Sequence, residues 1–409
     1  MAGPTAGPSR AALEPIWGMA AKLMQMPGST RSFVTLDGLR GIAALAVVTR
    51  HAPAFFSSIS IYVLPLDGSK VPILVGPFRE SYLAVDFFFA LSGFVLAHAY
   101  GDRLRRGMSA TRFMTIRLIR LYPLYFFALL ISLPLFLWGF ARGGIDPTYP
   151  MGNWLFAVLF LPSLASHSLL FPLNVPAWSL FYELLANAAF GLIGRFLDNT
   201  LLLSIVIFSG LVLLFAVYFG WLGFGASGSG ELDIGFLWRG FGAGAARVTF
   251  SFFAGILVFR VWKNYHLRFN VPSVFVVAAL MAILVANPPD RFQAAFDLVA
   301  TLLVFPCLIF LGASSVPSWL PSRLFKWIGA ASYAIYVLQA PLYDLTSHAV
   351  AHLNGRNLSE LSWTWGVAFV VFVLGFATIA DKYFDRPVRE KLSASLRTSA
   401  KAAAISGPI

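Results

Sequence analysis

An apolar run from Leu36 to Phe56, LDGLRGIAALAVVTRHAPAFF, is long enough to cross a membrane but carries Arg40, Arg50 and His51. Each ionisable group in a hydrocarbon layer costs roughly 2.5–3.5 kcal/mol, so such groups are kept where they face a polar interior. A helix built from this run therefore needs a partner surface that accepts its charges.

The spacing of Arg40 and His51 is the most specific feature of this run. Ten residues separate them, and eleven steps of about 100° return an α-helix to within ~20° of its starting face. Both side chains are therefore expected on one face, ~16 Å apart along the axis. In a hydrocarbon core ~30 Å thick, this places Arg40 at the entrance and His51 near the midplane. The structural alternative is an arginine that reaches the headgroups and a histidine in a helix–helix hydrogen bond.

The composition assigns the whole chain to the membrane. Of 409 residues, 58% are hydrophobic and 12% are charged, whereas soluble domains carry about 25% charged residues. We expect an all-α, polytopic transmembrane bundle. The formal net charge of +12 indicates basic cytoplasmic loops and contact with anionic lipid of the bilayer, and no nucleic-acid partner is expected. The single cysteine, Cys307, excludes an intramolecular disulfide and a multi-cysteine zinc site, and no metal is expected.

Charge distribution predicts about ten spans. The basic loop 102–112 and the basic residues after Asp381 should be cytoplasmic. Both termini are then inside, and the weakest apolar segment, Trp154–Leu170, is re-entrant or lies on the outer face. The predicted organisation is a flexible cytoplasmic tail (1–32), a membrane domain (33–387) and a basic cytoplasmic tail (388–409).

The third span opens with two arginines, Arg117 and Arg120, which share a helix face near the cytoplasmic end. A guanidinium group matches phosphate oxygens in a bidentate fork, so these two residues and Arg40 can form an anion-binding cluster. Ordinary positive-inside anchoring is the alternative. In the second span, Asp86 is expected to pair with a cation of the first helix, Arg50 being a candidate.

The stretch NVPAWSLFYELLAN carries another intramembrane charge, Glu183, about one turn in from the outer side. Ser179 and Glu183 are four residues apart and share a face, and Trp178 and Tyr182 share the neighbouring face. The two aromatic residues can form an interfacial belt or a platform on which a sugar stacks.

Together these segments resemble the acyltransferase-3 family of bacterial integral-membrane acyltransferases, over about Phe33 to Pro387. Two departures are visible: Gln339 stands where family members often have histidine, and Asp385-Arg386-Pro387 replaces a Glu-basic-Pro sequence. The resemblance rests on LDGLRGIAALAVVTRH with Arg40 and His51, DFFFALSGFVL, the Arg117–Arg120 pair before LYPLY, WSLFYE with Glu183, and SYAIYVLQAP.

The resemblance implies a multi-pass enzyme of the bacterial inner membrane. It would move an acyl group, usually acetyl, from cytoplasmic acetyl-CoA to a hydroxyl of an extracytoplasmic carbohydrate, with no tightly bound cofactor. Arg117, Arg120 and Arg40 would hold the coenzyme A phosphates. His51 would be a general base or a transient acyl carrier. Glu183 would orient His51 or bind the acceptor.

On this interpretation the acceptor would contact Trp178, Ser179 and Tyr182. The acceptor's identity and the oligomeric state stay open, and a homodimer is among the expected assemblies. The rival class is a transporter or flippase of a polar or lipid-linked substrate, which also places charges inside a membrane. Release of free coenzyme A from acetyl-CoA distinguishes the two classes.

Overall fold

The computed structural model describes residues 33–52, 62–63, 71–72, 78–141, 148–224, 232–265, 271–317, 319–355 and 363–405. The unit described below begins at Val34, and the predicted tail of residues 1–32 lies outside the described residues. Helices dominate, as the all-α prediction requires. They are α2 (Val34–His51), α4 (Ala84–Arg105), α5 (Ala110–Ala141), α6 (Thr148–Val158), α7 (Ala177–Ile193), α8 (Asn199–Phe219), α9 (Phe241–Asn264), α10 (Ser273–Leu284), α11 (Asp290–Val299), α12 (Phe305–Ser314), α13 (Trp319–Asn354), α14 (Trp363–Ala380) and α15 (Arg386–Ile405).

Short elements link these helices. The described strands are β1 (Tyr62–Val63) and β2 (Val71–Pro72), which pair antiparallel. Turns of 3-10 helix are η1 (Arg79–Leu83), η2 (Trp221–Gly223) and η3 (Trp238–Gly240). Two π-helical turns, η4 (Ala300–Val304) and η6 (Asp381–Asp385), join α11 to α12 and α14 to α15.

Six of the described helical segments are long and apolar enough to cross a membrane, which makes the chain a multi-pass membrane protein. Two shorter apolar helices, α7 and α10, accompany them. Neither α2 nor α13 belongs to these sets, because charged and polar side chains interrupt their apolar runs. The six are Arg79–Arg105, Ala110–Trp138, Asn199–Phe219, Trp238–Asn264, Asp290–Ser314 and Thr364–Leu396.

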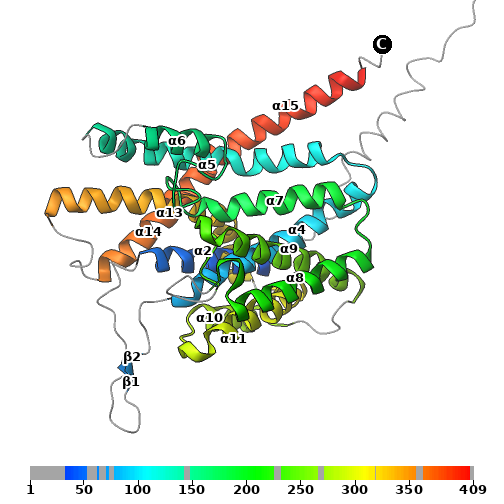
Figure 1. Ribbon diagram of the computed structural model, residues 1–409. Coiled ribbons are helices and arrows are strands. Elements are labelled where there is room, and N and C mark those ends of the chain that lie inside the picture. Colours follow the sequence, from blue (N-terminus) through cyan, green and yellow to red (C-terminus); the bar gives the residue numbers. More distant parts are fainter. Residues whose placement is uncertain are drawn as a thin grey trace, which may run out of the picture. The chain divides into compact units, whose positions relative to one another are not determined.

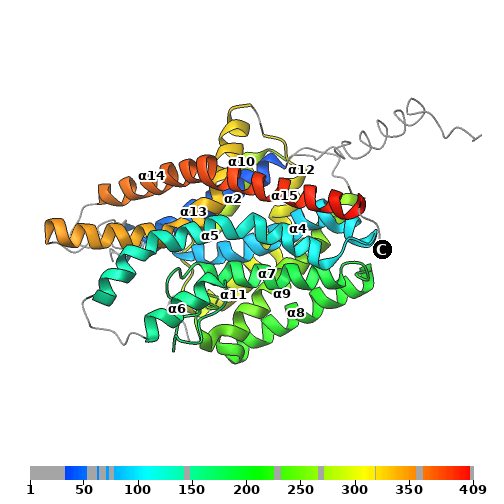
Figure 2. The same ribbon diagram turned by 90° about the horizontal axis from the view of Figure 1, so that it is seen from above.

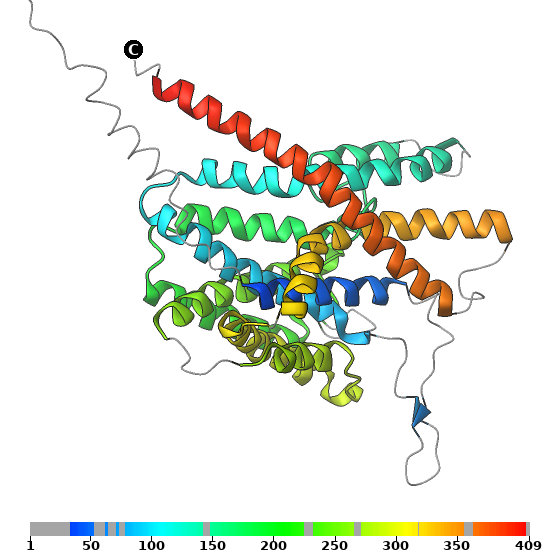
Figure 3. The same cartoon turned by 180° about the vertical axis from the view of Figure 1, so that it is seen from behind.

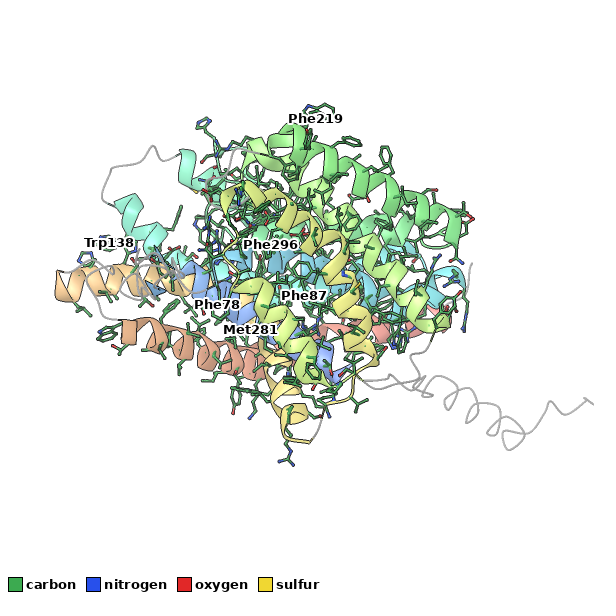
Figure 4. All side chains as sticks on the ribbon, turned by 90° about the horizontal axis from the view of Figure 1, so that it is seen from below. Phe78, Phe87, Trp138, Phe219, Met281 and Phe296 are labelled. Atoms are coloured by element: carbon green, nitrogen blue, oxygen red, sulfur yellow. The ribbon has the colours of Figure 1, made fainter. Side chains whose placement is uncertain are left out.

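The helices that build the site pack directly on one another. In Figures 1 and 2, α5 and α7 lie side by side and run in opposite directions, and α2 packs along α13. Figure 3 shows α14, η6 and α15 as one long rod that crosses α5. In Figure 4, Phe87 of α4 lies among the helices, where its ring meets Phe305 edge-on at 5.8 Å, whereas Phe219 projects at the edge of α8.

The first helix is shorter than predicted. It ends at His51, and Ala52 is no longer helical, so the expected run through to Phe56 is wrong at that point. The physical reason is Pro53, because a proline disfavours helical geometry in the residue before it. His51 is therefore the last residue of α2 and is exposed, with helix on one side only.

The weak apolar segment Trp154–Leu170 does not form a span-length helix. Helix α6 ends at Val158, and the chain continues in turns up to α7. Leu169 forms an isolated antiparallel bridge with Leu237, and the Trp238 indole nitrogen donates to the carbonyl oxygen of Ser163 at 3.1 Å. This segment therefore packs against the loop that precedes α9.

Glycine allows α4 and α9 to approach closely. A β-carbon at Gly93 would collide with the backbone of Phe252, and one at Gly255 would collide with the backbone of Ala90. Because the obstacle in each case is backbone rather than a flexible side chain, an added methyl group must push the helices apart.

We expect Gly93→Ala to lower the free energy of unfolding by about 1–3 kcal/mol, the usual cost of overpacking. Gly101→Ala on the same helix is the matched control, because nothing lies within 4 Å of a β-carbon there. The control should be neutral or up to about 1 kcal/mol more stable, since alanine favours helix over glycine. Thermal unfolding in detergent measures both, and equal unfolding temperatures would show that the crossing is not tight.

Candidate active site

A cavity of about 460 Å³ lies among α2, α4, α5, α7 and α13. It brings together five side chains, two of them acidic, that the sequence places far apart: Asp37, Arg40, Arg117, Arg120 and Glu183. Its other polar lining residues are Ser92, Tyr100, Ser179, Ser332, Tyr333 and Tyr336. Four of the predicted donor and catalytic residues and Ser179 thus share one cavity.

Arg40 is positioned by the close packing of α2 on α13. A β-carbon at Gly41 would lie 2.8 Å from the backbone of Ile328, and one at Gly329 would lie 2.5 Å from the carbonyl oxygen of Asp37. Across this contact Arg40 Nη2 donates to the Gly329 carbonyl oxygen at 2.7 Å, and Asp37 Oδ1 lies 3.6 Å from the same nitrogen. The Nε of Arg40 is buried and bonds to none of the described residues.

Arg117 and Glu183 form an ion pair in the cavity wall. Arg117 Nη2 lies 2.9 Å from Glu183 Oε1, which also accepts from Ser92 Oγ at 2.7 Å. The sequence placed Arg117 near the cytoplasmic end and Glu183 near the outer end, but the contact sets them at one level. Helix α7 has 17 residues and begins next to the loop before α9, where Trp178 packs on Gly235.

Arg120 presents a free guanidinium to the cavity. It lines the cavity, is exposed, and makes no hydrogen bond or ion pair with the part of the chain that the structure describes. With Arg40 and Arg117, it gives the cavity three cations against the carboxylates of Asp37 and Glu183. The cavity is therefore an electropositive site for an anion.

Arg40 and His51 lie on the same face of α2, as their spacing predicts. Arg40 reaches Gly329 on α13, and His51 Nδ1 lies 3.3 Å from Gln339 Oε1 on the same helix. His51 does not line the cavity. Of the two side chains predicted to share one cavity, the structure places Arg40 in the cavity and His51 outside it.

One end of the cavity lies about one helical turn from His51. Tyr336, three residues before the histidine's partner Gln339, lines that end. Its hydroxyl lies 2.7 Å from Ser179 Oγ, and its ring meets that of Phe88 edge-on at 5.6 Å. All three side chains line the cavity at this end.

Trp178 and Tyr182, the predicted sugar platform, do not line the cavity. Trp178 is 7% exposed and stacks under Arg247, whose guanidinium carbon lies 5.5 Å from the ring centroid. Tyr182 is fully buried, and its hydroxyl donates to the carbonyl oxygen of Phe241 at 2.8 Å. In this arrangement, both rings pack α7 against α9 and its preceding loop.

The predicted pair of Asp86 with Arg50 is wrong. Asp86 binds Arg247 of α9 in a bidentate pair with distances of 2.6 and 3.2 Å. Arg50 instead binds Asp233 at 2.6 Å, in the loop that precedes α9. Arg247 was not predicted as a partner, although a charge inside the apolar run of α9 is the same sequence signal that indicated Arg40.

The cavity also holds side chains that were not predicted from the sequence. Asp37, Ser92, Tyr333 and Tyr336 all line it. The two tyrosines are three residues apart in SYAIY, so helical spacing already placed them on one face of α13. Nothing in the sequence alone said which face meets the arginines.

The comparison with known protein families shows to which family this chain belongs. The family model described as an acyltransferase domain matches residues 33–381, most of the chain. This chain belongs to the acyltransferase-3 family. The resemblance drawn from the sequence motifs is thereby confirmed, and the acyltransferase-3 protein carries an acyltransferase domain over residues 33–381.

Two curated relatives are similar to this acyltransferase-3 protein. It is 24% identical over 394 residues to peptidoglycan O-acetyltransferase OatA of Listeria monocytogenes, covering 88% of this chain and 56% of OatA. It is 42% identical over 172 residues to "Protein 2 in picA locus" of Rhizobium radiobacter, covering 39% of this chain and 80% of that protein. The chain thus spans little more than half the length of OatA. No solved structure matches it.

Proposed function

We propose that this acyltransferase-3 protein transfers an acyl group, most simply acetyl, from cytoplasmic acyl-CoA to a hydroxyl of an extracytoplasmic carbohydrate. The observation that carries the proposal is the cavity that gathers Arg40, Arg117 and Arg120 around one space. Coenzyme A is a polyanion, and arginine is the side chain best suited to its phosphates. The similarity to OatA supports a surface polysaccharide as the acceptor.

The length of the cavity fits the donor. It follows α4 from Tyr100 to Val85, and fifteen residues of helix span ~22 Å. An extended pantetheine arm measures ~15–20 Å at roughly the reach of a peptide chain. Arg117 pairs with Glu183, which accepts a hydrogen bond from Ser92 about midway along this run. Phosphates bound on the Tyr100 side of the arginines would therefore leave the thioester toward the Tyr336 end, about one turn from His51.

At that end His51 acts as the base in our proposal. The acceptor hydroxyl loses its proton to the imidazole while its oxygen bonds to the thioester carbonyl carbon. The carbon–sulfur bond then breaks, and the coenzyme A thiolate takes the proton. The same residue can instead carry the acyl group briefly as a nucleophile. Glu183 holds Arg117 in place for the donor phosphates, and Ser179 meets the acceptor or the acyl group where it passes Tyr336.

The same proposal sets the topology in the bacterial inner membrane. In this proposal ten crossings are made by the six long apolar helical segments together with α7, α10, α2 and α13. Both termini are then cytoplasmic, and the basic segment from residue 388 begins within α15. This orientation opens the arginine end of the cavity to cytoplasmic acyl-CoA.

Thiol release tests the reaction class. Purified protein in proteoliposomes is given acetyl-CoA and polysaccharide from cells that lack the protein. Free coenzyme A should appear together with O-acetyl groups on the polysaccharide. Movement of polysaccharide with no thiol release would favour a transporter or flippase instead.

Arg120→Ala should weaken acetyl-CoA binding about 10- to 100-fold, because a hydrogen bond to a charged group contributes about 1.5–3 kcal/mol. Arg112→Ala is the matched control on the same helix, since Arg112 is exposed and lies outside the cavity. Its affinity should change less than about twofold, as for most surface charges. Calorimetric titration with acetyl-CoA measures both, and equal affinities for the two variants would remove Arg120 from the donor site.

A further inference from the structure

Gln339 is a buried amide whose orientation is fixed by two hydrogen bonds. Its side chain is 1% exposed. Its Nε2 donates to the carbonyl oxygen of Tyr336 at 3.2 Å, and its Oε1 lies 3.3 Å from His51 Nδ1. Turning the amide over would set its oxygen against the Tyr336 carbonyl oxygen. Only the orientation with Oε1 toward His51 satisfies both contacts.

This contact determines which nitrogen of His51 carries a hydrogen. An amide oxygen has no proton to give, so Nδ1 of His51 is the donor. A neutral imidazole carries hydrogen on one ring nitrogen only, so Nε2 keeps its lone pair. Among the described residues the His51 side chain is exposed, so an acceptor molecule can approach the ring.

We propose that Gln339 is the positioning residue of the acyl-transfer reaction: it holds His51 in the tautomer whose Nε2 takes the proton from the acceptor hydroxyl. The inference rests on the proposed function, which makes His51 the base. In the transfer, the acceptor O–H bond breaks, its oxygen bonds to the thioester carbon, and Nε2 receives the proton. The carbon–sulfur bond then breaks and the proton passes from Nε2 to the coenzyme A thiolate.

The backbone that presents this amide is itself fixed. Pro341 has no N–H, so the carbonyl oxygen of Val337 loses its helical donor. Asn174 Nδ2 replaces that donor at 3.1 Å. On the adjacent turn, the hydroxyl of Tyr336 is tied to Ser179 at 2.7 Å. A residue that orients a base needs this rigid support.

Nitrogen NMR of the wild-type protein tests the tautomer without any acceptor or turnover. With ¹⁵N-labelled histidine, and His51→Ala to assign the signal, we expect hydrogen on Nδ1 and none on Nε2 of His51. In Gln339→Leu the two tautomers should mix. Hydrogen on Nε2 in the wild-type protein would overturn the proposal.

The pH dependence of turnover distinguishes positioning from packing. Gln339→Glu keeps an acceptor oxygen and adds a negative charge beside the ring, which stabilises the imidazolium form. The acid limb of kcat, measured with acetyl-CoA and the polysaccharide, should move up by about one pH unit or more. Among the described residues, the charged side chains in the ion pairs at this end of α2 are Arg50, Arg79, Glu80 and Asp233, two of each sign, so the added charge should dominate the shift.

Gln339→Leu should lower kcat about tenfold with an unchanged KM for acetyl-CoA, because a neutral hydrogen bond is lost outside the donor cavity. Gln339→Glu should recover that loss above the shifted limb. An unmoved acid limb in Gln339→Glu, or a changed KM with constant kcat in Gln339→Leu, would overturn the proposal.

Full transfer by His51→Ala would refute the role of His51 as the base. The NMR result tests the contact between Gln339 and His51 independently of that role.

Discussion

Acyl transfer by His51→Ala should fall about 10²- to 10⁴-fold, the range expected when a general base is removed. Acetyl-CoA affinity should stay within about twofold of the wild type, because His51 lies beyond Tyr336 and outside the cavity that gathers the arginines. Thiol release measures the first quantity and calorimetric titration the second. The expected separation of turnover from binding follows directly from the position of His51 at the end of α2.

His348→Ala is the matched control for this variant. His348 is an exposed histidine whose Nδ1 lies 2.9 Å from the carbonyl oxygen of Asp344, far along α13 from the cavity. Its replacement should leave transfer within about twofold. Near-normal turnover by His51→Ala would show that the imidazole is neither base nor acyl carrier.

Asp86→Ala should prevent accumulation of folded protein. Asp86 and Arg247 are 0% and 1% exposed and form a bidentate pair. Removing one partner leaves a buried charge uncompensated, which costs about 3–5 kcal/mol. Because folded domains are stable by only about 5–15 kcal/mol, the yield of monodisperse protein in detergent should fall sharply.

Two further variants make this prediction specific. Asp102→Ala removes a carboxylate that is 55% exposed on the same helix and should cost no more than about 1 kcal/mol. The double variant Asp86→Leu with Arg247→Met removes both charges and should recover most of the yield, since apolar replacements of similar volume can match a buried pair. A double variant no better than Asp86→Ala would show that the loss is one of packing rather than charge.

Local periodicity was enough to predict the part of the site that lies within single helices. A spacing of eleven residues puts Arg40 and His51 on the same face of a helix, whatever packs around that helix. A spacing of three residues does the same for Arg117 and Arg120. Both predictions name residues that the structure places toward α13 or into the cavity. Helical class and membrane location follow equally from composition.

Contacts between helices were not predictable in this way. Two carboxylates, Asp86 and Asp233, can pair with two arginines, Arg50 and Arg247, in two combinations. Neither helical spacing nor composition favours one combination over the other. The choice depends on the loop before α9, which brings Asp233 to the end of α2. Gly235 of the same loop packs on Trp178. The ring that was predicted to stack on a sugar is therefore buried by the loop.

Sided proteoliposomes test the central claim most directly, namely that the arginine cavity receives acyl-CoA from one face and delivers the acyl group to the other. Radiolabelled acetyl-CoA is confined to the side of the basic 102–112 loop, and polysaccharide is confined to the opposite side. With the wild-type protein, label should appear on the polysaccharide. With Arg120→Ala at subsaturating acetyl-CoA, the amount of transferred label should fall. Transfer only when both substrates share one side, or equal transfer with acetyl-CoA confined to the opposite face, would contradict it.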